Sequence, residues 1–318
     1  MPPRALPSYA ELLQRTDAPP GTAWALFGAN DELGTLNLLT PERALAAARH
    51  VERGDVFSLN WRLEWPDPHP FHPHRQPPVR HQVGGGFGRD DWLDRFYLQG
   101  SSQWDGLRHI AHPRFGFYNG VAAAEVDDPS SARLGIQSTA RRGIVARGVL
   151  LDVAGHQARV GTAFRANEPF AIDADLLDAV AAAEGITIET ADVLVVRTGW
   201  TGWYSALPSG ERAHVTATTP QAGLAPVERT AAWLWDHHVA AVAADNLSLE
   251  VMPLAFEEGK FLHFWLIPCF GMPIGELFWL DDLARACAAD GRWTFQLVSA
   301  PLNLRGGVGS PPNALAIR

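Results

Sequence analysis

The stretch Gln99-Gly100-Ser101-Ser102-Gln103-Trp104-Asp105-Gly106-Leu107-Arg108-His109 places two amides, a carboxylate and an imidazole within eleven residues. In an extended segment, Gln99, Gln103, Asp105 and His109 have the same parity, so their side chains point to one side. Trp104 then points to the other side, into packing. The spacing indicates a group of polar ligands that face one cavity. The alternative is a polar strand edge followed by a turn.

A second group of chemically active residues lies in the mostly apolar segment 262–277. His263 and Glu276 are the ionisable residues of this segment, and burial of a charge is costly unless the charge is paired or binds a metal. The two residues are therefore candidate ligands. The alternative is a core histidine and a glutamate that opens a helix.

The first stretch resembles the signature of the metal-dependent cyclase family, which includes bacterial kynurenine formamidases and isatin hydrolases. The resemblance implies that Asp105 is a metal ligand and that His109 is the acid/base residue. His263 and Glu276 match two further family ligands, although their spacing is about one residue longer than in the common pattern. Three more segments are also similar to family segments, namely 148–152, 192–200 and 306–311.

Gln99 and Gln103 stand where the family has two metal-binding histidines. A glutamine can ligate through its carbonyl oxygen, but it is a neutral, harder and weaker ligand than imidazole. The exchange disfavours a tight zinc site and leaves manganese, magnesium, a weak site or no metal open. The predicted cofactor is a divalent metal, manganese or zinc, bound weakly or absent. Its predicted ligands are Gln99, Gln103, Asp105, His263 and Glu276.

The secondary-structure pattern predicts an α/β fold in which a mixed sheet is flanked by helices. Apolar runs at 148–153 and 192–196 indicate strands buried on both faces. Periodicity and capping residues predict helices at 41–51, 173–184 and 226–238, among others. The resemblance implies the swivelling β/β/α architecture of the cyclases. We expect one domain over 1–318, with an N-terminal arm at 1–60.

Residues 64–82 form a loop rich in proline and histidine. The prolines exclude a helix and keep the segment extended, so we expect a loop at the pocket mouth that contributes an aromatic or histidine side chain. Gly84–Gly88 is expected to be a flexible connector. Trp104, Trp200 and Asp245 are the further candidates for substrate contact, because aromatic side chains can form the wall of an apolar pocket and the family has an Asp near position 245.

The composition limits the possible partners and the cellular compartment. The chain has 318 residues, a net charge of -9 and no long basic run, so nucleic acid and anionic membranes are not expected partners. It also lacks a signal-peptide pattern at Met1–Arg4 and any apolar run long enough to span a membrane. The two cysteines show no metal-type spacing and predict a reduced, cytoplasmic protein. The resemblance implies a homodimer or homotetramer.

Three functional hypotheses follow from these residues. The first is a metal-dependent hydrolase of an amide, lactam or similar carbonyl bond in a small, partly aromatic molecule. The second is a metal-independent acid/base enzyme, such as a cyclase, dehydratase or isomerase, in which the two glutamines bind the substrate. The third is a non-catalytic relative that binds a small ligand.

Overall fold

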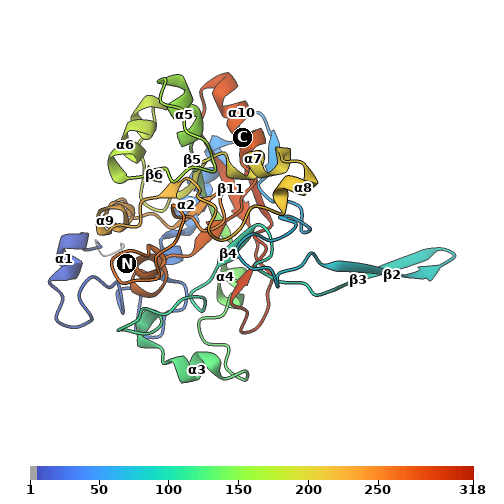
Figure 1. Cartoon of the computed structure of the whole chain (residues 1–318). Coiled ribbons are helices and arrows are strands. Elements are labelled where there is room, and N and C mark those ends of the chain that lie inside the picture. The colour runs from blue at the N-terminus through green and yellow to red at the C-terminus, as the bar shows by residue number, and fades with distance from the viewer. Residues whose placement is uncertain (1–5) are drawn as a thin grey trace.

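The computed structural model describes residues 6–318, and its centre is a mixed sheet of nine strands (Figure 1). The four strands β5, β7, β9 and β10 are parallel to one another, and the remaining neighbours pair antiparallel. In spatial order the strands are β1 (Val56–Ser58), β13 (Ala314–Ile317), β11 (Thr294–Ser299), β5 (Ile144–Leu151), β7 (Val193–Val196), β9 (Ala241–Ala244), β10 (Ile274–Glu276), β4 (Gln103–Asp105) and β12 (Gly309–Ser310).

Helices cover both faces of this sheet. They are α1 (Tyr9–Leu13), α2 (Pro41–Ala47), α3 (Ala123–Asp127), α4 (Gln137–Arg142), α5 (Val153–Arg159), α6 (Ala174–Ala183), α7 (Trp200–Ala206), α8 (Ser209–Arg212), α9 (Glu228–Asp236) and α10 (Asp281–Asp290). The predicted α/β class with a mixed, helix-flanked sheet is confirmed. Within residues 6–318, no helix is both long and apolar enough to cross a bilayer.

The alternating side chains of the central strands divide the core into two layers. Leu194 and Val196 pack with α6 and α9 on one face, whereas Val193 and Val195 pack with α10 on the other. Every residue of β7 is buried, which is the pattern of a parallel strand covered on both sides. The apolar run in the sequence therefore predicted this strand correctly.

Helix boundaries agree with the capping residues in the sequence. Thr40 caps α2 by accepting a hydrogen bond from the Arg43 amide, and Pro41 occupies the first turn. Asp173 caps α6 by accepting from the Leu176 amide. The predicted helix over 226–238 is present as α9, two residues shorter at each end.

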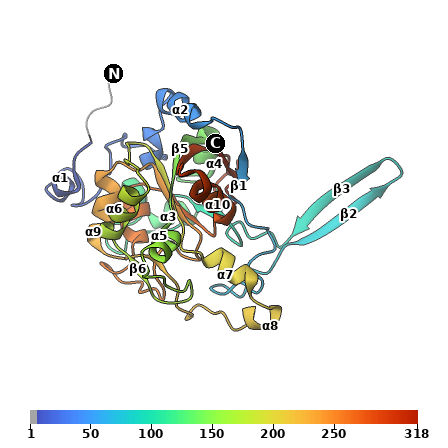
Figure 2. The ribbon, with the colours of Figure 1, turned by 90° about the horizontal axis from the view of Figure 1, so that it is seen from above.

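A long hairpin projects from the body of the molecule, and both views show it (Figures 1 and 2). It consists of β2 (Val79–Gly85) and β3 (Gly88–Asp94), which form a separate two-stranded sheet in the described part of the chain. The proline-rich loop therefore ends at residue 78, and the glycine segment that we expected to be a flexible connector is the turn of this hairpin. The antiparallel hydrogen bonds between β2 and β3 give this glycine segment its fixed conformation.

A small third sheet pairs β6 (Ala171–Ile172) with β8 (Gly223–Leu224).

Glu184, which caps the C-terminus of α6, has a buried carboxylate. Burial and the nearby charge of Asp152 raise its pKa from 4.5 to about 8, although Arg159 partly opposes this shift. Between about pH 5 and pH 8, Glu184 is therefore protonated in the folded protein but ionised in the unfolded chain. Stability consequently falls as the pH rises through this window.

Substitution of Glu184 by glutamine is expected to remove this loss of stability. At pH 9 the Glu184→Gln protein should exceed the wild type in free energy of unfolding by at least about 1 kcal/mol, since one pKa unit corresponds to about 1.4 kcal/mol. The two proteins should converge near pH 5. Urea unfolding at a series of pH values measures this difference. If the difference in free energy of unfolding between the two proteins does not change with pH, the pKa of Glu184 is not raised in the folded protein.

Candidate active site

Strands β4 and β10 bring the two sequence constellations together. They pair antiparallel, with Gln103 opposite Glu276 and Asp105 opposite Ile274. Gln103 and Asp105 lie two residues apart on one strand, so their side chains share a face with Glu276. Only Gln103–Asp105 is a strand, and the His109 amide donates to the Gly106 carbonyl in a turn. The segment is therefore extended only as far as Asp105, and the turn at Gly106, which was the alternative, places the imidazole.

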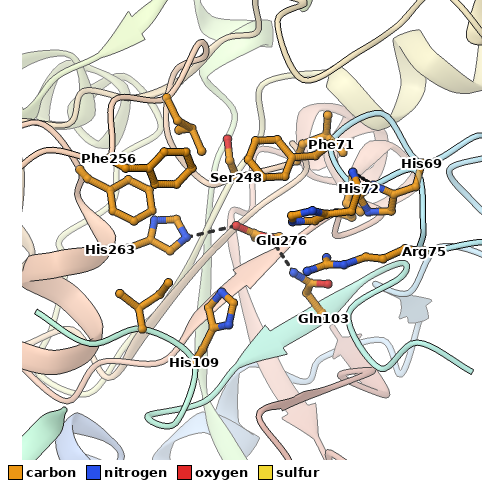
Figure 3. Close-up of a pocket in the computed structure, with 15 residues that line it drawn as sticks. His69, Phe71, His72, Arg75, Gln103, His109, Ser248, Phe256, His263 and Glu276 are labelled. Carbon is orange, nitrogen blue, oxygen red and sulfur yellow. Dashed lines mark hydrogen bonds and ion pairs between the residues drawn. The ribbon is translucent and has the colours of Figure 1, made fainter. Parts of the chain in front are cut away.

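The side chains of Asp105, His263 and Glu276 converge. One ligand atom from each of the three lies within 4.8 Å of the others, and all three residues are buried. His263 Nε2 lies 3.4 Å from a Glu276 oxygen, and the Gln103 amide donates to the other Glu276 oxygen at 2.6 Å (Figure 3). Four of the five predicted ligands thus surround one point.

Two buried oxygen atoms in this cluster have no hydrogen-bond partner within residues 6–318. They are Asp105 Oδ2 and Gln103 Oε1. Unpaired buried oxygens are costly, and oxygen and imidazole donors together are a set that divalent metals accept. The residues present therefore fit a divalent ion, held by Asp105, His263 and Glu276 with the Gln103 carbonyl oxygen as a further ligand.

Gln99 has a different position from the one predicted. Its amide nitrogen donates to Asp105 Oδ1 and lies 3.3 Å from His109 Nδ1. Gln99 does not line the cavity. The structure thus places Gln99 in contact with Asp105 and His109, and its assignment as a metal ligand stays a prediction.

Sequence reasoning missed Glu250, which holds His263 in place. Its carboxylate accepts hydrogen bonds from the His263 backbone amide, at 3.0 Å, and from the His263 ring at Nδ1. The contact leaves Nε2 directed at Glu276, and metal-binding histidines commonly have such a carboxylate partner. Glu250 stands alone between Leu249 and Val251, and this buried charge in an apolar segment is the same signal that indicated His263 and Glu276.

The charges of the site depend on burial. Burial opposes a positive charge on His263, but the hydrogen bonds with Glu250 and Glu276 outweigh it and raise the His263 pKa. Burial and the Asp105 charge raise the pKa of Glu276. Burial lowers the pKa of His109, against the opposing attraction of Asp105, so His109 is neutral at neutral pH and can accept a proton.

A cavity of about 210 Å³ opens in front of these residues. Gln103, His109, His263 and Glu276 form its polar end, and phenylalanine and leucine side chains form much of the remaining wall. The proline-rich loop contributes four residues to the wall rather than the one expected, namely His69, Phe71, His72 and Arg75. The positions of these loop residues could not be read from the sequence, because an irregular loop has no periodicity.

Three predicted substrate contacts do not line the cavity. Trp104 is fully buried behind the strand, where its indole nitrogen donates to Ser299. Trp200 packs within a separate aromatic cluster with Trp61 and Tyr204. Asp245 is fully buried and accepts hydrogen bonds from Thr198 and from the Gly199 amide. The structure thus corrects these assignments, because each position has a packing or loop-holding role.

The comparison with solved structures shows close agreement over nearly the whole chain. A crystal structure of a novel cyclase is 32% identical, with a TM-score of 0.81, and the match covers 93% of this chain and 99% of the other. An isatin hydrolase bound to the product analogue thioisatinate is 18% identical, with a TM-score of 0.55 and coverage of 87% and 98%. Isatin hydrolase A from Ralstonia solanacearum is 17% identical, with a TM-score of 0.56 and coverage of 87% and 97%.

The two isatin hydrolases share the fold of this chain, and at 17% to 18% sequence identity the similarity extends to the fold alone. A search of curated proteins gave no match. The family model for the cyclases matches residues 47–251, which include the β4 motif, the Pro/His loop and Glu250. Together with the 32% identity to the solved cyclase, this match confirms the predicted resemblance. The chain belongs to the cyclase family.

Proposed function

We propose that this protein is a metal-dependent hydrolase of an amide, lactam or similar carbonyl bond in a small, partly aromatic molecule. The convergence of Asp105, His263 and Glu276 carries the proposal, because His263 and Glu276 also line the polar end of a largely apolar cavity. The isatin hydrolases, which share the fold, support a hydrolytic reaction at a cyclic carbonyl compound. Cytoplasmic location and homo-oligomeric assembly stay predictions from the sequence.

Each polar residue has a distinct task in this reaction. Asp105, His263, Glu276 and the Gln103 carbonyl would hold the ion, which when bound supplies Lewis-acid polarisation of the carbonyl and water activation. Gln99 contacts His109 at Nδ1, which holds the ring in place at the cavity. His109 takes the proton of the water that attacks the carbonyl and delivers it to the leaving nitrogen as the carbon–nitrogen bond breaks. Phenylalanine side chains exclude water from the apolar body of the substrate.

The metal content tests the proposal most directly. Purified, untagged protein should contain about one equivalent of manganese or zinc per chain, and chelator treatment should remove it together with hydrolysis of amides and lactams. Restoring the ion at about 100 times its dissociation constant should stabilise the fold by about 2.7 kcal/mol. Elemental analysis combined with thermal unfolding measures both effects.

A metal-independent acid/base enzyme is the second candidate, and one observation favours it. The amide groups of Gln99 and Gln103 donate hydrogen bonds to Asp105 and Glu276, so both carboxylates have a partner without an ion. In that case the protein would contain no metal, added divalent ions would not change the unfolding temperature, and turnover would be insensitive to chelator.

A further inference from the structure

Arg75 reaches the cavity from the proline-rich loop, and Figure 3 shows its guanidinium pointing toward Gln103 and Glu276. Its Nη1 donates to the Gln99 backbone carbonyl at 2.5 Å. Within residues 6–318, no carboxylate oxygen lies within 4.0 Å of this guanidinium. A guanidinium has five N–H donors in a planar fork, so Arg75 keeps hydrogen-bonding capacity for a ligand in the cavity that it lines.

Two other partly buried arginines in this protein have carboxylate partners, whereas the buried Arg108 donates to several backbone carbonyls instead. Arg197 pairs with Asp152 at 2.8 Å and with Asp281 at 2.7 Å, and Arg147 pairs with Asp192 at 2.6 Å. Removing a guanidinium from water is costly unless such a partner replaces the water. Arg75, which is half-buried, lacks this partner in the described chain, and an anionic ligand in the cavity would supply it.

The cavity has two chemically different sides. Arg75, His69 and His72 form one side, and Arg75 is the only arginine or lysine among the described residues that line the cavity. Burial and the charge of Arg75 lower the pKa of His69 to about 3 and that of His72 to about 4, so both are neutral hydrogen-bonding groups at pH 7. Phe71, Phe256 and Phe261 contribute aromatic surface to the wall.

We propose that Arg75 binds a carboxylate of the substrate through a bidentate hydrogen-bonded pair. The substrate class is then a small carboxylic acid with one ring, whose ring contacts the phenylalanine side chains and whose amide or lactam carbonyl reaches Glu276 and His109. A cavity of about 210 Å³ is smaller than a typical pocket for drug-sized ligands, which limits the substrate to about one ring. The reaction named here rests on the proposed function, whereas the binding of the carboxylate does not.

Two nearly isosteric probes separate charge recognition from fit. 3-Phenylpropanoate and 3-phenylpropanamide have the same ring and chain, and only the first can form a charged pair with Arg75. Titration calorimetry should show that the wild type binds the acid at least about 10-fold more tightly than the amide. Arg75→Gln should lower the affinity for the acid by about 10- to 100-fold, which is the range for hydrogen bonds to charged groups. Its affinity for the amide should equal that of the wild type.

Two further variants control the experiment. Arg75→Lys keeps the charge but loses the planar fork, so it should bind the acid with intermediate affinity. Arg62→Gln removes an exposed arginine that lies outside the cavity lining, and it should bind both probes like the wild type. Circular dichroism confirms that each variant is folded. If Arg75→Gln does not fold, the acid-to-amide ratio of Arg75→Lys decides the question.

The proposal is overturned if the wild type binds acid and amide equally, or if Arg75→Gln keeps the acid-to-amide ratio of the wild type. The second outcome would mean that Arg75 only compensates the charges of Asp105 and Glu276. The titrations need neither turnover nor metal, so they are repeated after chelator treatment. Arg75-dependent acid binding in a protein that hydrolyses nothing would support this inference while the proposed hydrolase function fails.

Discussion

Substitution of His109 by alanine is expected to lower kcat by about 10²- to 10⁴-fold, the range typical of a lost general acid/base. His109 lines the cavity, and burial lowers its pKa so that the ring is neutral and ready to accept a proton. Its Nε2 lies 3.9 Å from Asp105 Oδ2, which places the ring beside the candidate ligands. The substitution removes the proton carrier but none of the residues that would hold the ion.

Metal content should therefore stay at the wild-type level in His109→Ala, and KM should change by less than kcat. Steady-state kinetics on an amide or lactam that the wild type hydrolyses, together with elemental analysis, separates these quantities. His74→Ala is the matched control, because His74 belongs to the proline-rich loop that lines the cavity but is itself exposed and outside the lining. A kcat near that of wild type in His109→Ala would remove His109 from the mechanism.

Substitution of Glu276 by glutamine is expected to abolish metal binding and turnover together. Glu276 contributes one of the three converging ligand atoms, and its carboxylate contacts both His263 and Gln103. Glutamine has the same shape but no charge and is a weaker ligand. We expect affinity for manganese or zinc to fall by at least about 100-fold, since even groups behind the ligands contribute 10- to 100-fold.

The metal-free forms should differ less, because the substitution conserves volume and removes both the attraction between Glu276 and His263 and the repulsion between Glu276 and Asp105, which oppose each other. Thermal unfolding should show that added metal stabilises the wild type but not Glu276→Gln, while the two proteins without metal unfold within a few degrees of each other. Glu257→Gln is the matched control, since Glu257 is exposed and pairs only with Lys260 on the surface. Retention of a full equivalent of metal by Glu276→Gln would exclude Glu276 as a ligand.

The candidate site residues could be predicted from the sequence where they are local or stand out chemically. The β4 motif places Gln103, Asp105 and His109 within seven residues, and His263 and Glu276 stand out as ionisable residues in an apolar segment. The approach of these two segments to each other was implied by resemblance. The β4–β10 register then showed it directly, with Glu276 opposite Gln103.

Arg75, Glu250 and the phenylalanine wall needed the tertiary structure. Arg75 lies in a proline-rich loop without periodicity. Its proposed role in binding a substrate carboxylate rests on the absence of a carboxylate partner within the described chain. Glu250 acts through contact with His263, thirteen residues away. Trp104 and Trp200, the predicted substrate contacts, do not line the cavity. Strand parity already pointed Trp104 into packing, whereas for Trp200 residue type alone cannot distinguish the wall of a cavity from the packed core.

The sequence by itself determined the α/β class, the buried central strands, the helix caps and the identity of most candidate ligands. These features depend on local periodicity, on capping chemistry and on the cost of burying a charge. The tertiary structure decided which residues face the cavity, Gln103 but not Gln99 among them, and that 79–94 forms a projecting hairpin. These features depend on contacts between segments far apart in the chain, and such contacts are fixed only when β4, β10 and the loops pack together.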